Sequence, residues 1–325
     1  MKAGGANEIA RYLTDKIGSG RIGLGEKLPT REVLMVRFGV ARATVDRAVQ
    51  TLVQRGWVET RRGAGSIVIN RSFPRRVGVI GTLMGVTALP QSPGVETVLL
   101  NPNRWQKAAA RERLQAFDGL LWHCPDSDAM SWISQLGDTI PQVVINRTPP
   151  DLNYVSTDHA GALYTVTLER LKAHAACLPV FLGLEEPGDV ISMRQEGFVR
   201  ACRERQVFYE ALNLPVVFAD KCTMLEQRLS KPRGGPLLLI SAALQNTGAV
   251  TRWVHDRGLR WGRDVLYSDF DNTFAADVFG ATVTSFVQDY AGMLDLALSG
   301  LINLLDGVQD RVQVLCPALR RKGDT

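Results

Sequence analysis

Residues 38–56, with the sequence FGVARATVDRAVQTLVQRG, constrain the N-terminal fold more than any other stretch. Apolar side chains recur there at helical i, i+3, i+4 spacing and would form one buried stripe: Val45, Ala48, Val49, Leu52 and Val53. Polar side chains lie off this stripe: Arg42, Thr44, Arg47 and Gln50. The sequence therefore predicts a helix with one packed face and one free face.

A second short helix and two glycines frame this predicted helix. Gly39 supplies a tight turn before it, and Gly56 suits the left-handed position after its end. Upstream, Thr30 is a candidate N-cap for a short helix with apolar contacts from residues 33–38. This order is a helix-turn-helix arrangement, whose second helix can enter the major groove of DNA with its first residues nearest the bases.

A further helix and a hairpin flank these elements. Residues 6–18 have apolar side chains on one side, which predicts an amphipathic helix with Asn7 as its N-cap. Residues 57–60 and 66–69 are β-prone runs joined by the turn-forming sequence RGAG. The sequence therefore predicts a hairpin, with Arg61 and Arg62 at its tip.

Three signatures occur in order within residues 6–70. They are IGSGRIGLGEKLP before the second helix, GVARATV at the start of the third, and RGAGS in the hairpin turn. Together they resemble the GntR-type winged helix-turn-helix domain. The resemblance implies DNA binding through residues at matching positions: Arg31, Arg42, Thr44, Arg47, Arg61, Arg62, Gly63 and Gly65.

Two acidic residues depart from that family's pattern. Glu32 stands where the family commonly has arginine, and Asp46 stands where it often has a basic residue. Either carboxylate could discriminate between bases, or could pair with Arg31, Arg47 or the backbone. Both alternatives stay open on the sequence alone.

The positive charge of the chain belongs to its first part. Residues 1–72 hold 13 Lys and Arg against 6 Asp and Glu, a net charge of +7, whereas the remainder holds 25 against 27, or −2, giving +5 in total. A small basic module on a near-neutral body favours binding to a polyanion through counterion release. A solvated basic surface is the alternative interpretation.

Composition excludes several classes of protein. No apolar run approaches the roughly 18 residues of a membrane span, and the N-terminus has no apolar signal core, so we expect a cytoplasmic protein. The five cysteines are odd in number and form no CxxC pair, which predicts free thiols. The four histidines form no metal-binding pattern. No cofactor or metal is expected.

After a basic linker at residues 71–76, β-rich apolar runs alternate with helical stretches. The runs predicted as strands are 77–80, 97–100, 119–122, 142–145, 180–182, 216–218, 237–240 and 265–267. Alternation of this kind predicts an α/β fold with doubly wound parallel sheets. Eight strands exceed a comfortable single sheet for this length, which favours two similar lobes.

Six ordered motifs then resemble the LacI-type, periplasmic-binding-protein-like effector domain over residues 76–325. They are VSTDHAGA, MRQEGFVRAC, LLLISAALQNTGAV, GLRWGRDVLYSDFDNT, TVTSFVQDYAGMLDLA and CPALRRKGDT. The resemblance implies a small ligand bound between two lobes that the chain crosses near residues 155, 285 and 314. Lobe 1 would hold about 77–154 and 286–313, and lobe 2 about 156–284 and 315–325.

The same resemblance implies the ligand-binding residues. Arg194, in RQEGF, and Asp271, in DFDN, match positions that reach ligand hydroxyls in the family, with Asp158 and Arg147 as further candidates. An arginine fork and a carboxylate suit a polyol, because they offer donors and acceptors in fixed directions. In the alternative interpretation, Arg194 and Asp271 only pair with each other to hold the structure together.

Two departures bear on the ligand. The family's Asn-Asp pair after LLLI is Ala242-Ala243 here, which removes polar groups. Only about fourteen residues separate the first two predicted strands, and they include Pro90 and Pro93. We therefore expect the first crossover helix of the family to be missing or reduced.

The leading interpretation is a sequence-specific DNA-binding transcriptional regulator, a repressor that binds a pseudo-palindromic operator as a homodimer and responds to a sugar-like effector. A ligand-independent repressor with a vestigial cleft is the first alternative. An enzyme on a doubly wound sheet is the second, and against it the chain has no GxGxxG, GxxxxGK[ST] or GxSxG motif.

Overall fold

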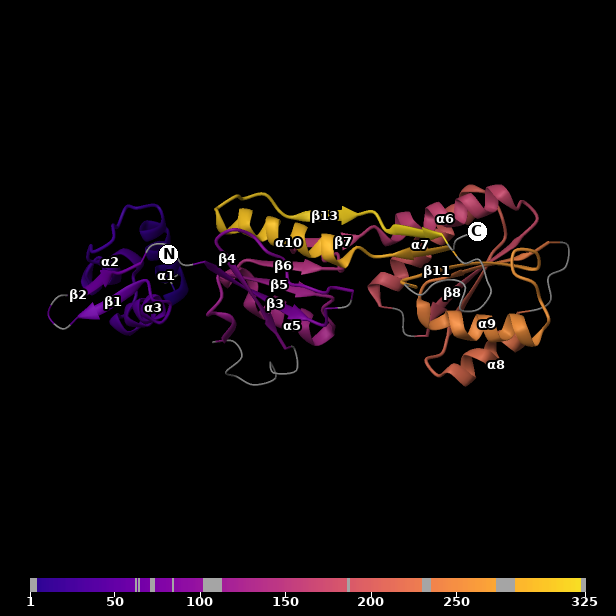
Figure 1. Ribbon diagram of the computed structural model, residues 1–325, viewed down its shortest axis with the longest axis horizontal. Helices are drawn as coiled ribbons and strands as arrows, with labels where there is room; N and C mark the ends of the chain where they lie inside the picture. The colour runs from indigo at the N-terminus through magenta and orange to yellow at the C-terminus, as the bar shows by residue number, and fades with distance from the viewer. Residues whose placement is uncertain are drawn as a thin grey trace. The chain divides into compact units, whose positions relative to one another are not determined.

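A computed structural model describes residues 5–61, 63, 65–70, 74–83, 85–101, 113–185, 188–229, 235–272 and 284–322 (Figure 1). The chain divides into two compact units: residues 1–144 with 294–311, and residues 145–293 with 312–325. A small helical domain with a hairpin is followed by two six-stranded sheets. The mixed α/β fold with parallel sheets is the one predicted from the sequence.

The N-terminal domain packs three helices against a two-stranded hairpin. The elements are α1 (Ala6–Gly18), α2 (Arg31–Phe38), α3 (Arg42–Gln54), β1 (Val58–Arg61) and β2 (Gly65–Val68). Its core holds the predicted apolar stripes of the helices together with one face of the hairpin: Ile9, Leu13, Ile17, Leu34, Val45, Ala48, Val49, Leu52, Val58 and Val68. The helix-turn-helix and the hairpin are therefore confirmed.

The helix ends follow local chemistry, with one exception. The Thr30 hydroxyl accepts a hydrogen bond from the Val33 amide at 3.4 Å and caps α2. Gly39 (φ 62°) and Gly56 (φ 69°) take the left-handed conformation after α2 and α3, as predicted. The prediction of Asn7 as N-cap of α1 is wrong. The helix already begins at Ala6 after an extended Gly5, so Asn7 lies inside the first turn.

The first sheet has the strand order β13-β7-β6-β5-β3-β4. Its strands are β3 (Arg75–Gly81), β4 (Val95–Leu100), β5 (Gly119–His123), β6 (Gln142–Ile145), β7 (Tyr154–Thr157) and β13 (Gln313–Cys316). The helical elements are α5 (Ser127–Leu136), η2 (Gly137–Thr139) and α10 (Tyr290–Leu305). Helix α10 packs closely on this sheet, because a Cβ at Gly119 would lie 2.9 Å from the Leu301 side chain.

The connection from β3 to β4 is short. Its described residues, 82–83 and 85–94, contain no helix, and β4 pairs directly with β3 in parallel. The prediction of a missing first crossover helix is therefore confirmed for these residues. Strand β4 lies at the edge of the sheet and has no fully buried residue.

The second sheet has the order β14-β12-β11-β10-β8-β9. Its strands are β8 (Leu178–Leu184), β9 (Glu210–Leu214), β10 (Leu237–Ser241), β11 (Val265–Phe270), β12 (Thr284–Val287) and β14 (Leu319–Lys322), the last antiparallel to β12. The helical elements are α6 (His159–Ala173), α7 (Asp189–Glu204), α8 (Phe218–Arg228), η3 (Leu244–Asn246) and α9 (Thr247–Asp256).

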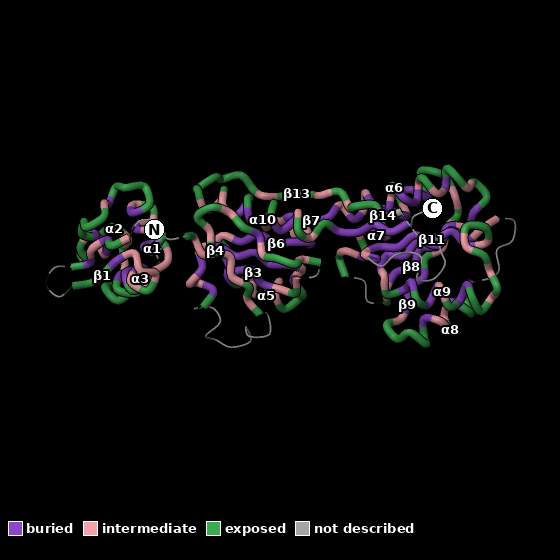
Figure 2. Tube along the Cα trace, in the orientation of Figure 1, coloured by how far each residue is buried: buried purple, intermediate pink, exposed green. Residues whose placement is uncertain are grey.

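Two hydrophobic clusters cover opposite faces of this sheet. Leu238 and Ile240 of β10 belong to the cluster with α6 and α7, whereas Leu237 and Leu239 belong to the cluster with α8 and α9. The alternation follows from the period of two in a strand. Figure 2 shows the result as buried strands between helices whose outer sides are exposed.

One predicted strand is misplaced. Residues 216–218 are not a strand: the strand in this region is β9, and Phe218 begins α8. The apolar residues Val216, Val217 and Phe218 are all exposed, so their hydrophobicity does not reflect burial in a sheet. Besides β9, four strands were not predicted: β7, β12, β13 and β14, which have four residues each and lie toward one side of each sheet.

Within the described residues, no helix combines the length and apolar character needed to cross a membrane. None of the five cysteines, all of which lie among the described residues, forms a disulfide, and Cys177 and Cys202 are buried.

Candidate functional site

The first residues of α3 form an exposed polar face on the N-terminal domain. Arg42 keeps 69% of its side-chain surface exposed, Arg47 and Gln50 are exposed, and Thr44 is half-buried. On the opposite side of α3, Val45 and the other stripe residues are buried. This is the distribution expected of a helix that packs on one side and is free to contact DNA on the other.

An ion-pair group holds the two arginines nearest this face. Arg31 Nε lies 3.2 Å from Asp46 Oδ1, and Arg42 Nε lies 3.8 Å from Asp46 Oδ2. Arg31 Nη1 also donates to the hydroxyl of Ser66 in β2 at 2.9 Å. Asp46 therefore pairs with Arg31, one of the alternatives left open by the sequence, and Arg31 is held between α3 and the hairpin.

The hairpin tip combines glycines with an arginine. Gly63 and Gly65 have φ angles of 77° and 87°, which favour glycine. Arg61 is 58% exposed and donates to Glu59 Oε2 at 2.9 Å from Nη2. Arg62, also predicted to bind DNA, lies outside the described residues.

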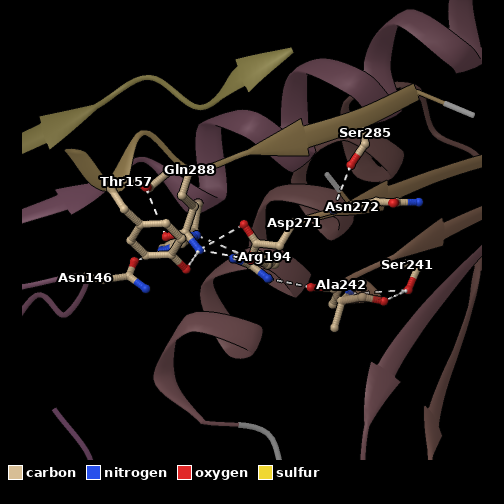
Figure 3. Close-up of polar contacts among 12 residues, drawn as sticks. Asn146, Thr157, Arg194, Ser241, Ala242, Asp271, Asn272, Ser285 and Gln288 are labelled. Carbon is tan, nitrogen blue, oxygen red and sulfur yellow. Dashed lines mark hydrogen bonds and ion pairs between the residues drawn. The ribbon is translucent and has the colours of Figure 1, made fainter. Parts of the chain in front are cut away.

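Arg194 of α7 is the centre of a buried polar network in the second unit (Figure 3). Only 3% of its surface is exposed. Its Nε donates to His159 Nδ1 (3.2 Å), Nη1 to the carbonyl oxygen of Ala242 (2.6 Å) and Nη2 to Asp271 Oδ2 (3.2 Å). The guanidinium also lies over the ring of Phe270, 3.6 Å from its centroid. The predicted pair Arg194 and Asp271 is therefore in direct contact.

Asp271 is held from its other side by an amide. Gln288 Nε2 donates to both carboxylate oxygens of Asp271, at 3.1 and 2.9 Å, and lies 2.6 Å from the hydroxyl of Tyr290. Gln288 Oε1 accepts from the Thr157 hydroxyl at 3.1 Å. Residues at the carboxyl ends of β7, β11 and β12 thus meet in one network (Figure 3).

His159 is a neutral member of this network. Its Nδ1 accepts from Arg194, so its Nε2–H is the donor to Asn146 Oδ1 at 2.9 Å. Burial, followed by the charges of Arg194 and Arg147, lowers the His159 pKa to about 2. The imidazole therefore serves as a fixed hydrogen-bond bridge at any physiological pH.

Two residues of the network have a backbone conformation that non-glycine residues rarely adopt. Asn146 (φ 63°) follows β6 and Asp271 (φ 65°) follows β11. Left-handed residues of this kind cluster at ligand-binding sites, where the surrounding structure offsets their conformational cost. The arrangement gives a physical reason to consider this network a binding site.

The other two predicted ligand residues are placed differently. Arg147 follows Asn146 and donates from Nη1 to the Asn146 carbonyl oxygen at 2.7 Å. Asp158 caps α6, since its Oδ1 accepts from the Gly161 amide at 2.8 Å. Among the described residues, neither side chain bonds directly to Arg194 or Asp271. Their proposed contact with a ligand stays a prediction.

Sequence reasoning missed much of the network. Ala242 lacks a polar side chain but supplies its carbonyl oxygen to Arg194, a role that residue type does not reveal. Asn146 directly follows the predicted strand at residues 142–145, so a polar residue after an apolar run was the available signal there. Gln288 could not be found this way, because β12 itself was not predicted.

Comparison with known proteins assigns the first domain. Residues 6–68 match the model described as "Bacterial regulatory proteins, gntR family". The N-terminal domain is a GntR-family helix-turn-helix domain. The arabinose metabolism transcriptional repressor of Halalkalibacterium halodurans is 25% identical over 232 residues, which cover 62% of this chain and 61% of the repressor. The chain thus spans about three fifths of that relative's length.

Downstream of the GntR-family domain, solved structures match the sheets. A LacI-family regulatory protein from Chloroflexus aggregans has a TM-score of 0.63 at 17% identity, covering 77% of this chain and 98% of that one. The transcriptional regulator CelR in complex with cellobiose has a TM-score of 0.58 at 17% identity, covering 91% and 99%. The remainder of the chain therefore has the fold of LacI-family regulators.

Proposed function

We propose that this protein is a transcriptional repressor that binds DNA through its GntR-family domain and responds to a sugar-like effector at the Arg194 network. One observation carries the proposal: a single chain joins a GntR-family domain to a LacI-type sheet domain in which Arg194 of α7 contacts Asp271, directly after β11. Relatives support it, since one is named an arabinose metabolism repressor and another was solved with cellobiose.

DNA would be read by α3 and positioned by the hairpin. Arg42 and Thr44 lie at the start of α3, where side chains reach base edges. Contacts to phosphates would come from Arg47, from the hairpin arginines Arg61 and Arg62, and from the turn at Gly63 and Gly65. Such contacts fix the position of the protein on the DNA without reading the base sequence. Arg31 would act through Asp46 and Ser66, because its guanidinium is already held by both.

The effector would use the donors and acceptors of the Arg194 network. Asp271 has 30% of its side chain exposed, so an oxygen of its carboxylate can accept from a hydroxyl, while Arg194 supplies fixed donors. Asp158 and Arg147, the other two predicted ligand residues, would also contact the effector. The two lobes would follow the boundaries predicted above, and the active form would be a homodimer on a pseudo-palindromic operator.

A ligand-independent repressor is the second candidate. It is favoured by the pairing of Arg194 with Asp271 and by the buried, apolar Ala242 and Ala243 side chains, which offer nothing polar to a sugar. An enzymatic role has less support, since the relatives are transcriptional regulators.

The test is a binding experiment in two steps. Purified protein would first be used to select sequences from its own genomic DNA, and the enriched fragment would be measured by fluorescence anisotropy. Arabinose, ribose and cellobiose, together with their phosphates and acids, would then be added to the complex. We expect a nanomolar Kd for the operator. One class of sugar should change this Kd at least about tenfold, which corresponds to a coupling free energy of about 1.4 kcal/mol between sugar and DNA binding. Operator binding that no sugar changes would favour the ligand-independent candidate.

A further inference from the structure

Arg55 joins the end of α3 to the first sheet. It directly follows the last residue of α3, and its side chain makes two hydrogen bonds to residues that precede β5. Nη1 donates to Asp118 Oδ1 at 2.6 Å, and Nη2 donates to the carbonyl oxygen of Ala116 at 2.8 Å. Only 17% of the Arg55 side chain and 22% of the Asp118 side chain are exposed. The GntR-family domain and the first sheet, which belong to the same compact unit, therefore share a largely buried ion pair.

Asp118 is fixed by the sheet. Its Oδ2 accepts a hydrogen bond from the Arg76 amide at 2.8 Å, and its own amide donates to the Arg76 carbonyl oxygen at 2.8 Å. Arg76 lies in β3, and Asp118 directly precedes β5, the neighbour of β3 in the sheet. A charge-assisted hydrogen bond at a largely buried site is stronger than an ion pair in open solvent. The contact therefore ties the end of α3 to the amino ends of β3 and β5.

Helix α1 approaches the same part of the sheet. Burial raises the pKa of the Asp15 carboxyl in α1, the charges of Arg11 and Arg75 oppose this shift, and the charge of Asp118 adds to it. Arg75 begins β3, so Asp15 lies within electrostatic reach of the first residues of both strands. Two helices of the DNA-binding domain, and not one side chain alone, thus face the amino ends of β3 and β5.

The contact lies at the opposite end of α3 from the predicted DNA-binding residues. Arg42 begins the helix and Arg55 follows its last residue, so the two are about 20 Å apart along the helix axis at 1.5 Å per residue. Arg42 keeps 69% of its side chain exposed. The contact at Arg55 therefore leaves the DNA-facing end of α3 free, and it defines the direction in which the sheet presents that end.

We infer that the Arg55–Asp118 contact is a positioning contact that fixes the orientation of α3 and thereby selects the spacing between the two half-sites of the operator. The inference rests on the proposed function, in which a homodimer binds a pseudo-palindromic operator, and adds a specificity determinant outside the DNA-binding residues. One additional base pair moves a half-site by about 3.4 Å and turns it by about 35° around the DNA axis. A helix fixed to the sheet cannot follow this change, whereas a helix released from the sheet can.

The test measures the spacing preference of the full chain. The operator selected from genomic DNA is remade with the segment between its half-sites changed by about one, two or four base pairs, and a duplex with a single half-site serves as the reference. The variants are Arg55→Gln, Asp118→Asn and the two combined. The control is Arg257→Gln in the second unit. Arg257 directly follows α9 and likewise donates to a carboxylate and a carbonyl oxygen, both of Glu226.

We expect the wild-type protein and Arg257→Gln to lose at least about tenfold in affinity when the spacing changes by one or two base pairs. Arg55→Gln and Asp118→Asn should lose no more than about threefold, and the double variant should behave like either single variant, because all three remove the same contact. On the single half-site, all the proteins should bind alike and with the same salt dependence, since the Arg55 guanidinium is held by the sheet.

Three results would contradict the inference, and they differ from one another. If Arg55→Gln and Asp118→Asn keep the spacing preference of the wild type, or the wild type has none, the positioning role is wrong while the proposed DNA binding stands. If Arg55→Gln alone weakens binding to the single half-site and lowers its salt dependence, Arg55 is a phosphate contact. If the wild-type protein selects no genomic fragment, the proposed function itself fails. Circular dichroism and the melting temperature of each variant separate loss of the contact from loss of fold.

Discussion

At the scale of single residues, Arg42 is the more exposed of the two arginines that pair with Asp46, and it lies at the start of α3. Arg42→Ala should weaken binding to the specific operator by roughly 1 to 3 kcal/mol, the range of a good base contact. Binding to unrelated DNA should change less. Competition anisotropy with specific and random duplexes measures both. The control is Arg205→Ala, which removes an exposed arginine directly after α7, outside the GntR-family domain. Equal losses on the two duplexes would place Arg42 on phosphate instead.

His159 makes stability depend on acid pH. Its pKa is lowered to about 2 in the folded protein, so the unfolded chain binds a proton first as the pH falls below its ordinary value of 6.5. This residue's contribution to stability is complete above pH 6.5 and decreases by about 1.4 kcal/mol per pH unit below it. Urea unfolding from pH 7.5 to 4.5 should show a shallower pH dependence in His159→Gln than in the wild type. Parallel curves would show that the pKa of His159 is not lowered by folding.

We expect Asp271 to contribute both to the stability of the fold and to the proposed ligand binding. Asp271→Ala leaves the buried Arg194 without its carboxylate, so the unliganded protein should lose about 1.5 to 3 kcal/mol of stability as well as its effector response. Asp271→Asn keeps an acceptor for Arg194 and should recover most of the stability but not the response. Calorimetric unfolding and effector titration of the two variants separate the roles. An effector response retained by Asp271→Asn would argue against recognition through the carboxylate.

At the scale of elements, α6 and α7 approach each other at a glycine. A Cβ at Gly197 of α7 would lie 2.0 Å from the carbonyl oxygen of Ala160 in α6. Since α6 carries His159 and α7 carries Arg194, Gly197→Ala should separate the two side chains by moving the helices apart. We expect a destabilisation of about 1 to 3 kcal/mol and a weakened effector response.

The control for this prediction is Gly188→Ala. Gly188 precedes the same helix and has no heavy atom within 4 Å of an added Cβ. Its φ of −71° is ordinary for alanine, so its melting temperature and effector response should stay close to those of the wild type. A similar loss in both variants would indicate an effect on α7 itself instead of on its packing.

Local patterns explain what could be predicted. Helix α3 was predicted because its buried apolar residues recur at helical spacing. Strand β10 was predicted because it is a continuous apolar run, and all five of its residues are buried. Both β9 and β13 lie at sheet edges and were not predicted. Strand β9 alternates exposed with buried or half-buried residues, and the first three residues of β13 are all exposed, so neither is a continuous buried run. The contact of Arg194 with Asp271 was anticipated from motifs. The link from Thr157 to Gln288 joins residues 131 positions apart and has no local signal.

At the scale of the whole molecule, we expect a homodimer in solution. A single GntR-family domain offers too few contacts for useful specificity in a genome, and two-fold symmetry doubles them on a pseudo-palindromic site. Sedimentation velocity at micromolar concentration should give about twice the 35.7 kDa chain mass, both alone and with DNA carrying two half-sites. Monomer under both conditions would contradict this expectation.

The closed network around Arg194 also sets how sensitive such a regulator can be. In the structure, Arg194 donates to three protein groups and Asp271 accepts from two. An arriving molecule must replace some of these hydrogen bonds instead of filling open positions, so only the difference appears as affinity. If an effector binds at this network as proposed, we therefore expect its affinity to be modest, so that the regulator would respond to an abundant compound and not to a trace of one.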